Sequence, residues 1–184
     1  MKRHGLQGPI DDAFMDSFIF VLPSGDEANR SLSDWVAAEA EDARVQWWRQ
    51  FRGEARVKRD YELTEEDIEN SHLILWGDPS SNQILGRIQN SLPFEWEGSQ
   101  ITLNGKAYDT HKQLPVLVYP NPLNQERYIV LNSSFTFSEF SGGTNSLQIP
   151  KLPDWAVIDL SVTRDQRHSQ GVVDAGFFDE QWQF

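Results

Sequence analysis

Residues 73–82 read LILWGDPSSN, an apolar run followed by a turn and a row of small polar residues. The first four side chains are all apolar, which predicts a strand that is buried on both faces. The Gly-Asp-Pro sequence that follows ends this strand. Ser80 with Gln83 fits a capping box, so we expect a helix to begin there and to run to about Asn90. A strand, a turn and a helix in immediate succession indicate an α/β fold.

The same order of elements occurs upstream of this stretch. Phe18–Leu22 is another continuous apolar run and predicts a second buried strand. Apolar side chains at spacings of three and four predict a helix over 31–51, with Ser31 as its cap. Alternating residues over 55–60 predict an edge-side strand, and Thr64 before three acidic residues predicts a helix start. The resulting β-α-β-α-β-α order is typical of a doubly wound, mostly parallel sheet.

The second half of the chain has a different pattern. Asn104-Gly105 predicts a hairpin over 101–108, because this dipeptide favours a two-residue turn. A Pro- and Asn-rich loop is expected over 120–127. The remaining expected elements are strands at 116–119, 128–131 and 155–158 and a helix within 136–149. We therefore predict a three-layer α/β fold with a mixed sheet of about six or seven strands, doubly wound in the first half and with an antiparallel hairpin in the second.

Length and composition predict a single folded domain. The chain has 184 residues, of which 39% are hydrophobic, including seven Trp and eleven Phe. That is enough apolar material for a core, so disorder is disfavoured. We assign residues 17–162 to one α/β domain and residues 1–16 to a lead-in segment that packs loosely on it. Residues 163–184 form a tail whose aromatic end predicts packing on the domain or on a partner.

Charge and cysteine content exclude several functional classes. The formal net charge is −12, so binding to nucleic acid or to anionic membranes is disfavoured. The absence of cysteine excludes disulfides, thiol catalysis and cysteine-based zinc sites. No apolar run approaches the ~18 residues that span a bilayer, and the N-terminus lacks the pattern of a signal peptide. These features are compatible with an exported parent protein as well as with a cytosolic one.

The turn after residue 76 is the first candidate for a binding site. Gly77, Asp78, Ser80 and Asn82 follow a predicted strand and precede a predicted helix. In open α/β sheets, ligands bind beyond the carboxyl ends of the strands, and helix N-termini offer free N–H groups. The alternative is that these residues only make the turn and cap the helix. Asp78 also argues against a bound phosphate, because both carry negative charge.

The predicted loop between the strands at 116–119 and 128–131 holds the second candidate. Asn121 and Arg127 lie in it, and an arginine pairs well with a carboxylate of a ligand. If this loop faced the turn at 77–82, the two would form one site for a small ligand. The alternative is a rigid, bent connection that the prolines shape.

The sequence contains no complete catalytic or metal-binding constellation. The nucleophile elbow is absent because residue 22 is Leu rather than Gly, and the dinucleotide fingerprint and the P-loop are missing. The four histidines, at positions 4, 72, 111 and 168, have no metal-site spacing. We assign no catalytic residue, metal or cofactor. A dispersed arrangement of Ser24 with His72 or His168 stays open, because triad members can be far apart in sequence.

Several segments form a pattern beyond these motifs: 5–14 (GLQGPIDDAF), 70–82 (NSHLILWGDPSSN), 119–128 (YPNPLNQERY), 153–157 (PDWAV) and 175–179 (AGFFD). Together they resemble the C-terminal region of large predicted bacterial hydrolases, which carry a prolyl-oligopeptidase or esterase-type α/β-hydrolase domain upstream. The resemblance covers most of the chain and carries no catalytic residues.

The resemblance implies a non-catalytic accessory or interaction domain of a larger bacterial hydrolase, rather than an enzyme. Its partner would be the catalytic domain of the same parent protein or another protein. The alternatives are a hydrolase with a non-standard Ser/His/Asp site and a small-ligand binding module near residues 77–82.

Overall fold

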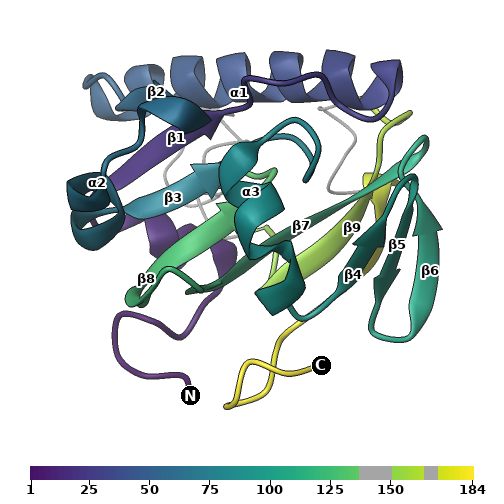
Figure 1. Cartoon of the computed structure of the whole chain (residues 1–184). Helices are drawn as coiled ribbons and strands as arrows, with labels where there is room; N and C mark the ends of the chain where they lie inside the picture. Colours follow the sequence, from purple (N-terminus) through teal and green to yellow (C-terminus); the bar gives the residue numbers. More distant parts are fainter. Residues whose placement is uncertain (137–150, 164–169) are drawn as a thin grey trace.

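The computed structural model describes residues 1–136, 151–163 and 170–184, and within them the chain forms a seven-stranded sheet in the order β10-β9-β7-β8-β3-β1-β2 (Figure 1). Its strands are β1 (Phe18–Leu22), β2 (Val57–Arg59), β3 (His72–Leu75), β7 (Gln113–Asn121), β8 (Asn124–Leu131), β9 (Trp155–Asp159) and β10 (Val172–Gly176). Strands β2, β1, β3 and β8 are parallel, whereas β8, β7, β9 and β10 pair antiparallel. The predicted mixed sheet, with a doubly wound first half, is confirmed.

Helices cover both faces of this sheet. The long helix α1 (Arg30–Phe51) lies along one face, and the short helices α2 (Glu65–Asn70) and α3 (Gln83–Ile88) lie on the other (Figure 1). The chain moves from β1 to β2 in one direction and from β2 to β3 in the opposite direction, so right-handed crossovers place α1 and α2 on opposite faces. The predicted three layers are therefore present. The point where the order reverses lies between β1 and β3.

Aromatic side chains fill the layer between α1 and the sheet. The ring of Trp47 on α1 lies 4.6 Å from that of Phe18 and 5.5 Å from that of Phe135. Phe14, from the N-terminal segment, packs edge-on against Phe18 at 5.1 Å. Such edge-to-face pairs add to the free energy that burial alone supplies.

The predicted helix caps are partly wrong. Asn29, not Ser31, caps α1, and its side chain accepts a hydrogen bond from the Leu32 N–H. Asn82, not Ser80, caps α3, which is shorter than predicted. Thr64 caps α2 as predicted, in a reciprocal capping box with Asp67. Asn and Ser are about equally good caps, so propensity alone did not choose between neighbouring candidates.

A separate three-stranded sheet comprises β4 (Glu95–Glu97), β5 (Gln100–Leu103) and β6 (Lys106–Asp109). It contains the predicted hairpin, with Asn104 and Gly105 at positive φ of 50° and 72°. The predicted loop over 120–127 is mostly strand instead. Only two residues separate β7 from β8, and Asn121 accepts the Leu123 N–H inside that turn. The helix expected within 136–149 falls, apart from Thr136, outside the described residues.

Both ends of the chain contribute to the core. The N-terminal segment packs more tightly than expected, because a 3-10 turn, Ile10–Phe14, buries Ile10, Ala13 and Phe14. The C-terminal segment adds β10 to the sheet and buries Phe178 and Trp182. Among the described residues, no helix is long and apolar enough to cross a membrane.

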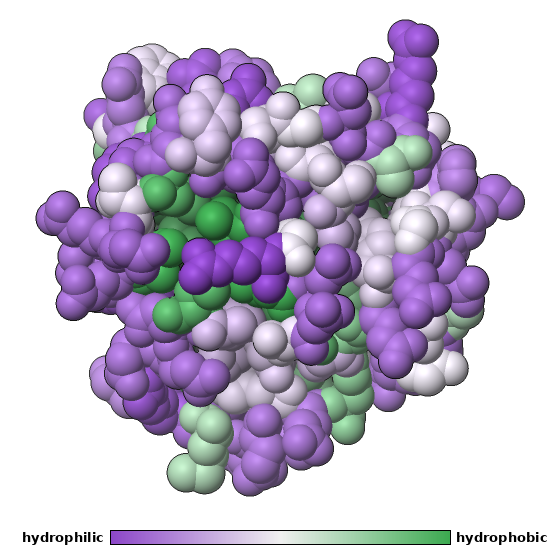
Figure 2. Space-filling model, viewed as in Figure 1, coloured by the Kyte–Doolittle hydropathy of each residue, from purple (hydrophilic) through white to green (hydrophobic). Residues whose placement is uncertain are grey.

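The surface is largely hydrophilic on the face seen in Figure 1. Figure 2 shows hydrophobic atoms gathered in a hollow over β3, between α2 and α3, with hydrophilic side chains around them.

Candidate functional site

The turn over 77–82 lies at the carboxyl end of β3, beside the loop that follows β1. This is the switch point of the sheet, where open α/β proteins bind ligands. Hydrogen bonds join the two loops: the Gly25 N–H donates to the Ser81 carbonyl at 2.9 Å, and the Ala28 N–H donates to the Asp78 carboxylate at 2.7 Å.

Asp78 is used to hold these loops together. Its side chain is buried, and besides Ala28 it accepts the N–H groups of Ser80 and Ser81, both at 2.9 Å, and the Ser80 hydroxyl at 2.7 Å. A carboxylate with this many internal donors has little capacity left for a ligand.

Asn82 and Gly77 are likewise occupied by the protein itself. Asn82 is fully buried, caps α3, and donates to the Trp76 carbonyl at 3.0 Å. Gly77 exchanges two hydrogen bonds with the amide of Asn132, at 2.8 and 2.9 Å. Gly77 has a φ of 104°, and a Cβ there would lie 2.5 Å from the Ser81 hydroxyl, so no other residue fits without rearrangement. Only Ser80 is exposed among the four candidates of this turn.

Asn121 and Arg127 lie at the opposite end of the sheet from this turn. In the parallel pair of β3 and β8, Leu73 is opposite Ile129, so Arg127 is level with the start of β3. Arg127 donates to Asp16 at 2.8 Å and to the Glu69 carbonyl at 3.2 Å. Asn121 is buried in its turn. The six candidate residues therefore do not form one site.

The dispersed triad is separated in the same way. Phe18 of β1 is opposite His72 of β3, and Ser24 follows the other end of β1. The two side chains are about 20 Å apart along the strands, at ~3.3 Å per residue, so Ser24 and His72 cannot share a proton. His168 lies outside the described residues.

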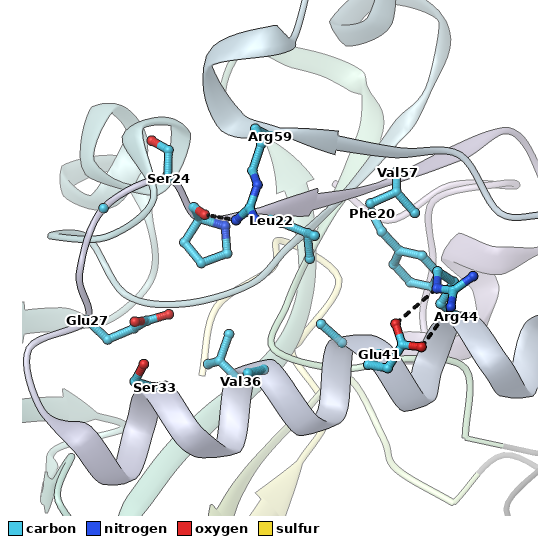
Figure 3. A pocket seen from close by; sticks show the side chains of 14 residues that line it. Phe20, Leu22, Ser24, Glu27, Ser33, Val36, Glu41, Arg44, Val57 and Arg59 are labelled. Carbon is cyan, nitrogen blue, oxygen red and sulfur yellow. Dashed lines mark hydrogen bonds and ion pairs between the residues drawn. The ribbon is translucent and has the colours of Figure 1, made fainter.

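A groove between α1 and the carboxyl ends of β1 and β2 has a volume of about 370 Å³ (Figure 3). Phe20, Leu22 and Val57 form its sheet side, and Val36 projects from the helix. We refer to it as the α1 groove. Its volume and apolar floor are typical of ligand sites.

Polar groups lie at both ends of the α1 groove. At one end, Arg44 makes a two-pronged ion pair with Glu41, at 2.7 and 3.0 Å, which lowers the pKa of Glu41 (Figure 3). At the other end are Glu27 and Ser33. Arg59 crosses the rim and donates to the Pro23 carbonyl at 2.6 Å.

Two small residues of α1 leave room for this groove. Ala37 and Ala40 lie on the part of α1 that lines it, where larger side chains would fill the space. In the sequence Ala40 belongs to the apolar stripe of this helix and does not indicate a groove, because the width of the gap depends on packing that a sequence pattern does not report.

Another cavity lies at the amino ends of β3 and β8 and has a volume of about 460 Å³. The N-terminal segment forms one wall with Arg3 and Asp12, and the sheet contributes His72 and Arg127. We refer to it as the amino-end hollow. His72 and Arg127, which are 55 residues apart in the sequence, thus line the same cavity.

His72 is almost fully buried in the wall of this hollow. Its Nδ1 accepts the Tyr128 N–H at 2.8 Å. Burial, assisted by the positive charge of Arg127, lowers the pKa of His72 to about 4, against opposing effects of Asp16 and Asp12. The ring is therefore neutral at pH 7.

The described residues contain no group of three or more side chains that could hold a metal ion. The chain matches no protein-family profile, no curated protein and no solved structure.

Proposed function

We propose that this chain is a non-catalytic accessory domain of a larger bacterial hydrolase, and that it binds an extended segment of the catalytic module in the α1 groove. The observation that carries this proposal is the open groove with an apolar floor at the carboxyl ends of β1 and β2. The resemblance of several segments to the C-terminal regions of such hydrolases supports the choice of partner.

The shape of the groove favours a peptide segment over a compact small molecule. Its helical wall extends from Ser33 to Arg44, which is about 16 Å at 1.5 Å per residue. An extended peptide of about five residues has the same length. The apolar floor would contact every second side chain of the peptide, and Arg44 and Glu41 would bind polar groups of the peptide at one end of the groove.

Recognition would rely on side chains rather than on an added strand. Strand β2 is an edge strand, but the Arg59 N–H, at its end, is bonded to the Glu62 carboxylate at 2.7 Å. Only Val57–Arg59 is extended, so a new strand would find few free backbone groups. The apolar floor is therefore the main source of affinity.

The separation of Ser24 from His72 rules out this pair for a hydrolase in its own right, and the other partner considered, His168, lies outside the described residues. The internal hydrogen bonds of Asp78 and Asn82 likewise weaken the small-ligand alternative at residues 77–82. Neither alternative has an observation in its favour that equals the α1 groove.

A matched pair of substitutions tests the proposal. Ala37 and Ala38 are neighbours on α1 and both are exposed, but only Ala37 lines the groove. A library of random peptides displayed on phage would be selected on the full chain, and the enriched peptides synthesised for anisotropy titrations. We expect Ala37→Arg to weaken their binding about tenfold or more, since a long charged side chain would enter the groove, whereas Ala38→Arg leaves it nearly unchanged.

Two results would contradict the proposal. Either no peptide is enriched over repeated selections, or the enriched peptides bind both variants equally well. Circular dichroism and thermal unfolding of each variant establish that any loss does not come from misfolding.

A further inference from the structure

The amino-end hollow contains a hydrogen-bond donor that the fold does not use. Because Nδ1 of neutral His72 accepts the Tyr128 N–H, the ring proton is on Nε2. Nε2 makes no hydrogen bond within the described part of the chain, yet it is not among the fully enclosed polar atoms. His72 is only 3% exposed and lines the hollow, so a ligand reaches this N–H through the cavity.

A guanidinium lies on the same wall. Arg127 uses Nη1 for Asp16 and Nε for the Glu69 carbonyl, which leaves Nη2 without a hydrogen bond among the described residues. It lines the same hollow as His72. A neutral N–H beside a fixed guanidinium is a suitable pair of donors for one carboxylate.

An acceptor lies on the facing wall. The Tyr128 hydroxyl donates to one oxygen of Asp12 at 2.7 Å, and burial raises the pKa of Tyr128, so the phenol keeps its proton. The other Asp12 oxygen has no hydrogen-bond partner in the described chain. A carboxylate oxygen in this position can accept hydrogen bonds from an ammonium group.

The balance of charges selects a ligand with both signs. Arg3 pairs with Glu126 and Arg127 pairs with Asp16, so Asp12 is the carboxylate of the hollow that no ion pair among the described residues neutralises. A phosphate dianion would be repelled by the Asp12 carboxylate, and a simple cation would leave the N–H donors of His72 and Arg127 without an acceptor. A ligand whose carboxylate and ammonium are close together can bind the N–H donors of His72 and Arg127 and the carboxylate of Asp12 at the same time.

We propose that the amino-end hollow binds a free α-amino acid, with its carboxylate on His72 and Arg127 and its ammonium on Asp12. The cavity of about 460 Å³ is large enough for the backbone atoms and a side chain. This site is at the opposite end of the sheet from the α1 groove, and it does not depend on the accessory role proposed for the domain.

Calorimetric titration with the common amino acids tests this assignment. We expect at least one to bind, and its analogues that lack either the amino or the carboxyl group to bind at least about tenfold more weakly. His72→Asn removes the Nε2 donor while its amide oxygen can still accept the Tyr128 N–H, so binding should fall about tenfold. His111→Asn, at an exposed histidine elsewhere, should bind as the wild type does.

Nuclear magnetic resonance of the unaltered protein provides a second measurement. The imidazole Nε2–H signal of His72 should shift on addition of the amino acid that binds, which keeps the test valid if His72→Asn unfolds. The proposal fails if no amino acid binds, if the His72 signal does not move, or if inorganic phosphate binds in place of amino acids.

Discussion

At the scale of single residues, buried polar groups decide how the loops of this protein are held. Asp78 is bonded to both loops at the switch point, and Asn82 links the start of α3 to the end of β3. His72 has a corresponding place at the other end of the sheet, where it accepts a backbone N–H from β8. Each of these hydrogen bonds forms only when two separate segments are in place.

The pH dependence of stability tests the state of His72. Its pKa is about 4 in the folded chain and about 6.5 when unfolded, so between these values the unfolded state binds more protons. The free energy of unfolding therefore falls as the pH falls through this window. His72 alone should contribute a loss of about 2 kcal/mol between pH 7 and pH 5.

Urea denaturation at both pH values measures this contribution. His72→Asn should reduce the difference between pH 7 and pH 5, whereas His111→Asn should retain it. An unchanged difference in His72→Asn would show that other groups cause the pH dependence.

At the scale of elements, the start of α1 illustrates how a loop selects a cap. Ser31 and Asn29 both have suitable side chains, but Asp78 holds the preceding loop through the Ala28 N–H. This contact makes Asn29 the last non-helical residue, with an extended φ of −154°. The choice depends on a partner fifty residues away, which a local pattern does not contain.

Substitution of Asn29 and of Ser31 shows which of the two residues caps α1. Asn29→Ala should lower the free energy of unfolding by about 1 kcal/mol, because the Leu32 N–H loses its acceptor. Ser31→Ala should change it little, since Ser31 is exposed within the helix. Thermal unfolding of both variants measures the difference, and equal losses would contradict this cap assignment.

The helices and strands were more predictable from the sequence than the cavities that form where they pack together. The runs at Phe18–Leu22 and residues 73–76 predicted buried strands because both faces of the sheet are covered. The two cavities were not predictable in this way. His72 and Arg127 are far apart in the sequence. They line one cavity only because β8 pairs directly with β3, although the small sheet and β7 lie between these two strands in the sequence. The α1 groove depends on the gap between a helix and a sheet edge, which is a property of packing.

At the scale of the whole molecule, the two ends of the chain are joined to each other. The Lys2 ammonium donates to the Asp154 carboxylate at 2.6 Å and to the Phe178 carbonyl at 2.9 Å, and it lies 5.0 Å from the ring centroid of Trp182. The Phe178 N–H donates to the same carboxylate. Burial raises the pKa of Asp154, and Lys2 opposes that effect. The segments at 1–16 and 170–184 are therefore parts of one folded unit.

Removal of the Lys2 charge tests this connection. Lys2→Met should lower the free energy of unfolding by about 3 kcal/mol, because Asp154 is fully buried and would lose its cation. The double variant with Asp154→Asn should recover part of the loss, and Lys112→Met at an exposed lysine should cost little. Urea denaturation measures all three, and a Lys2→Met variant as stable as the wild type would contradict the prediction.

The position of β8 has a consequence for synthesis of the chain on the ribosome. Strand β3 is buried between β1 and β8, and β8 ends only at Leu131. The first half can form its helices and pair β1 with β2 and β3 as it emerges, but one edge of β3 stays open until β8 follows. During that interval an apolar strand edge is exposed, so slow translation before residue 131 would prolong the period in which nascent chains can aggregate.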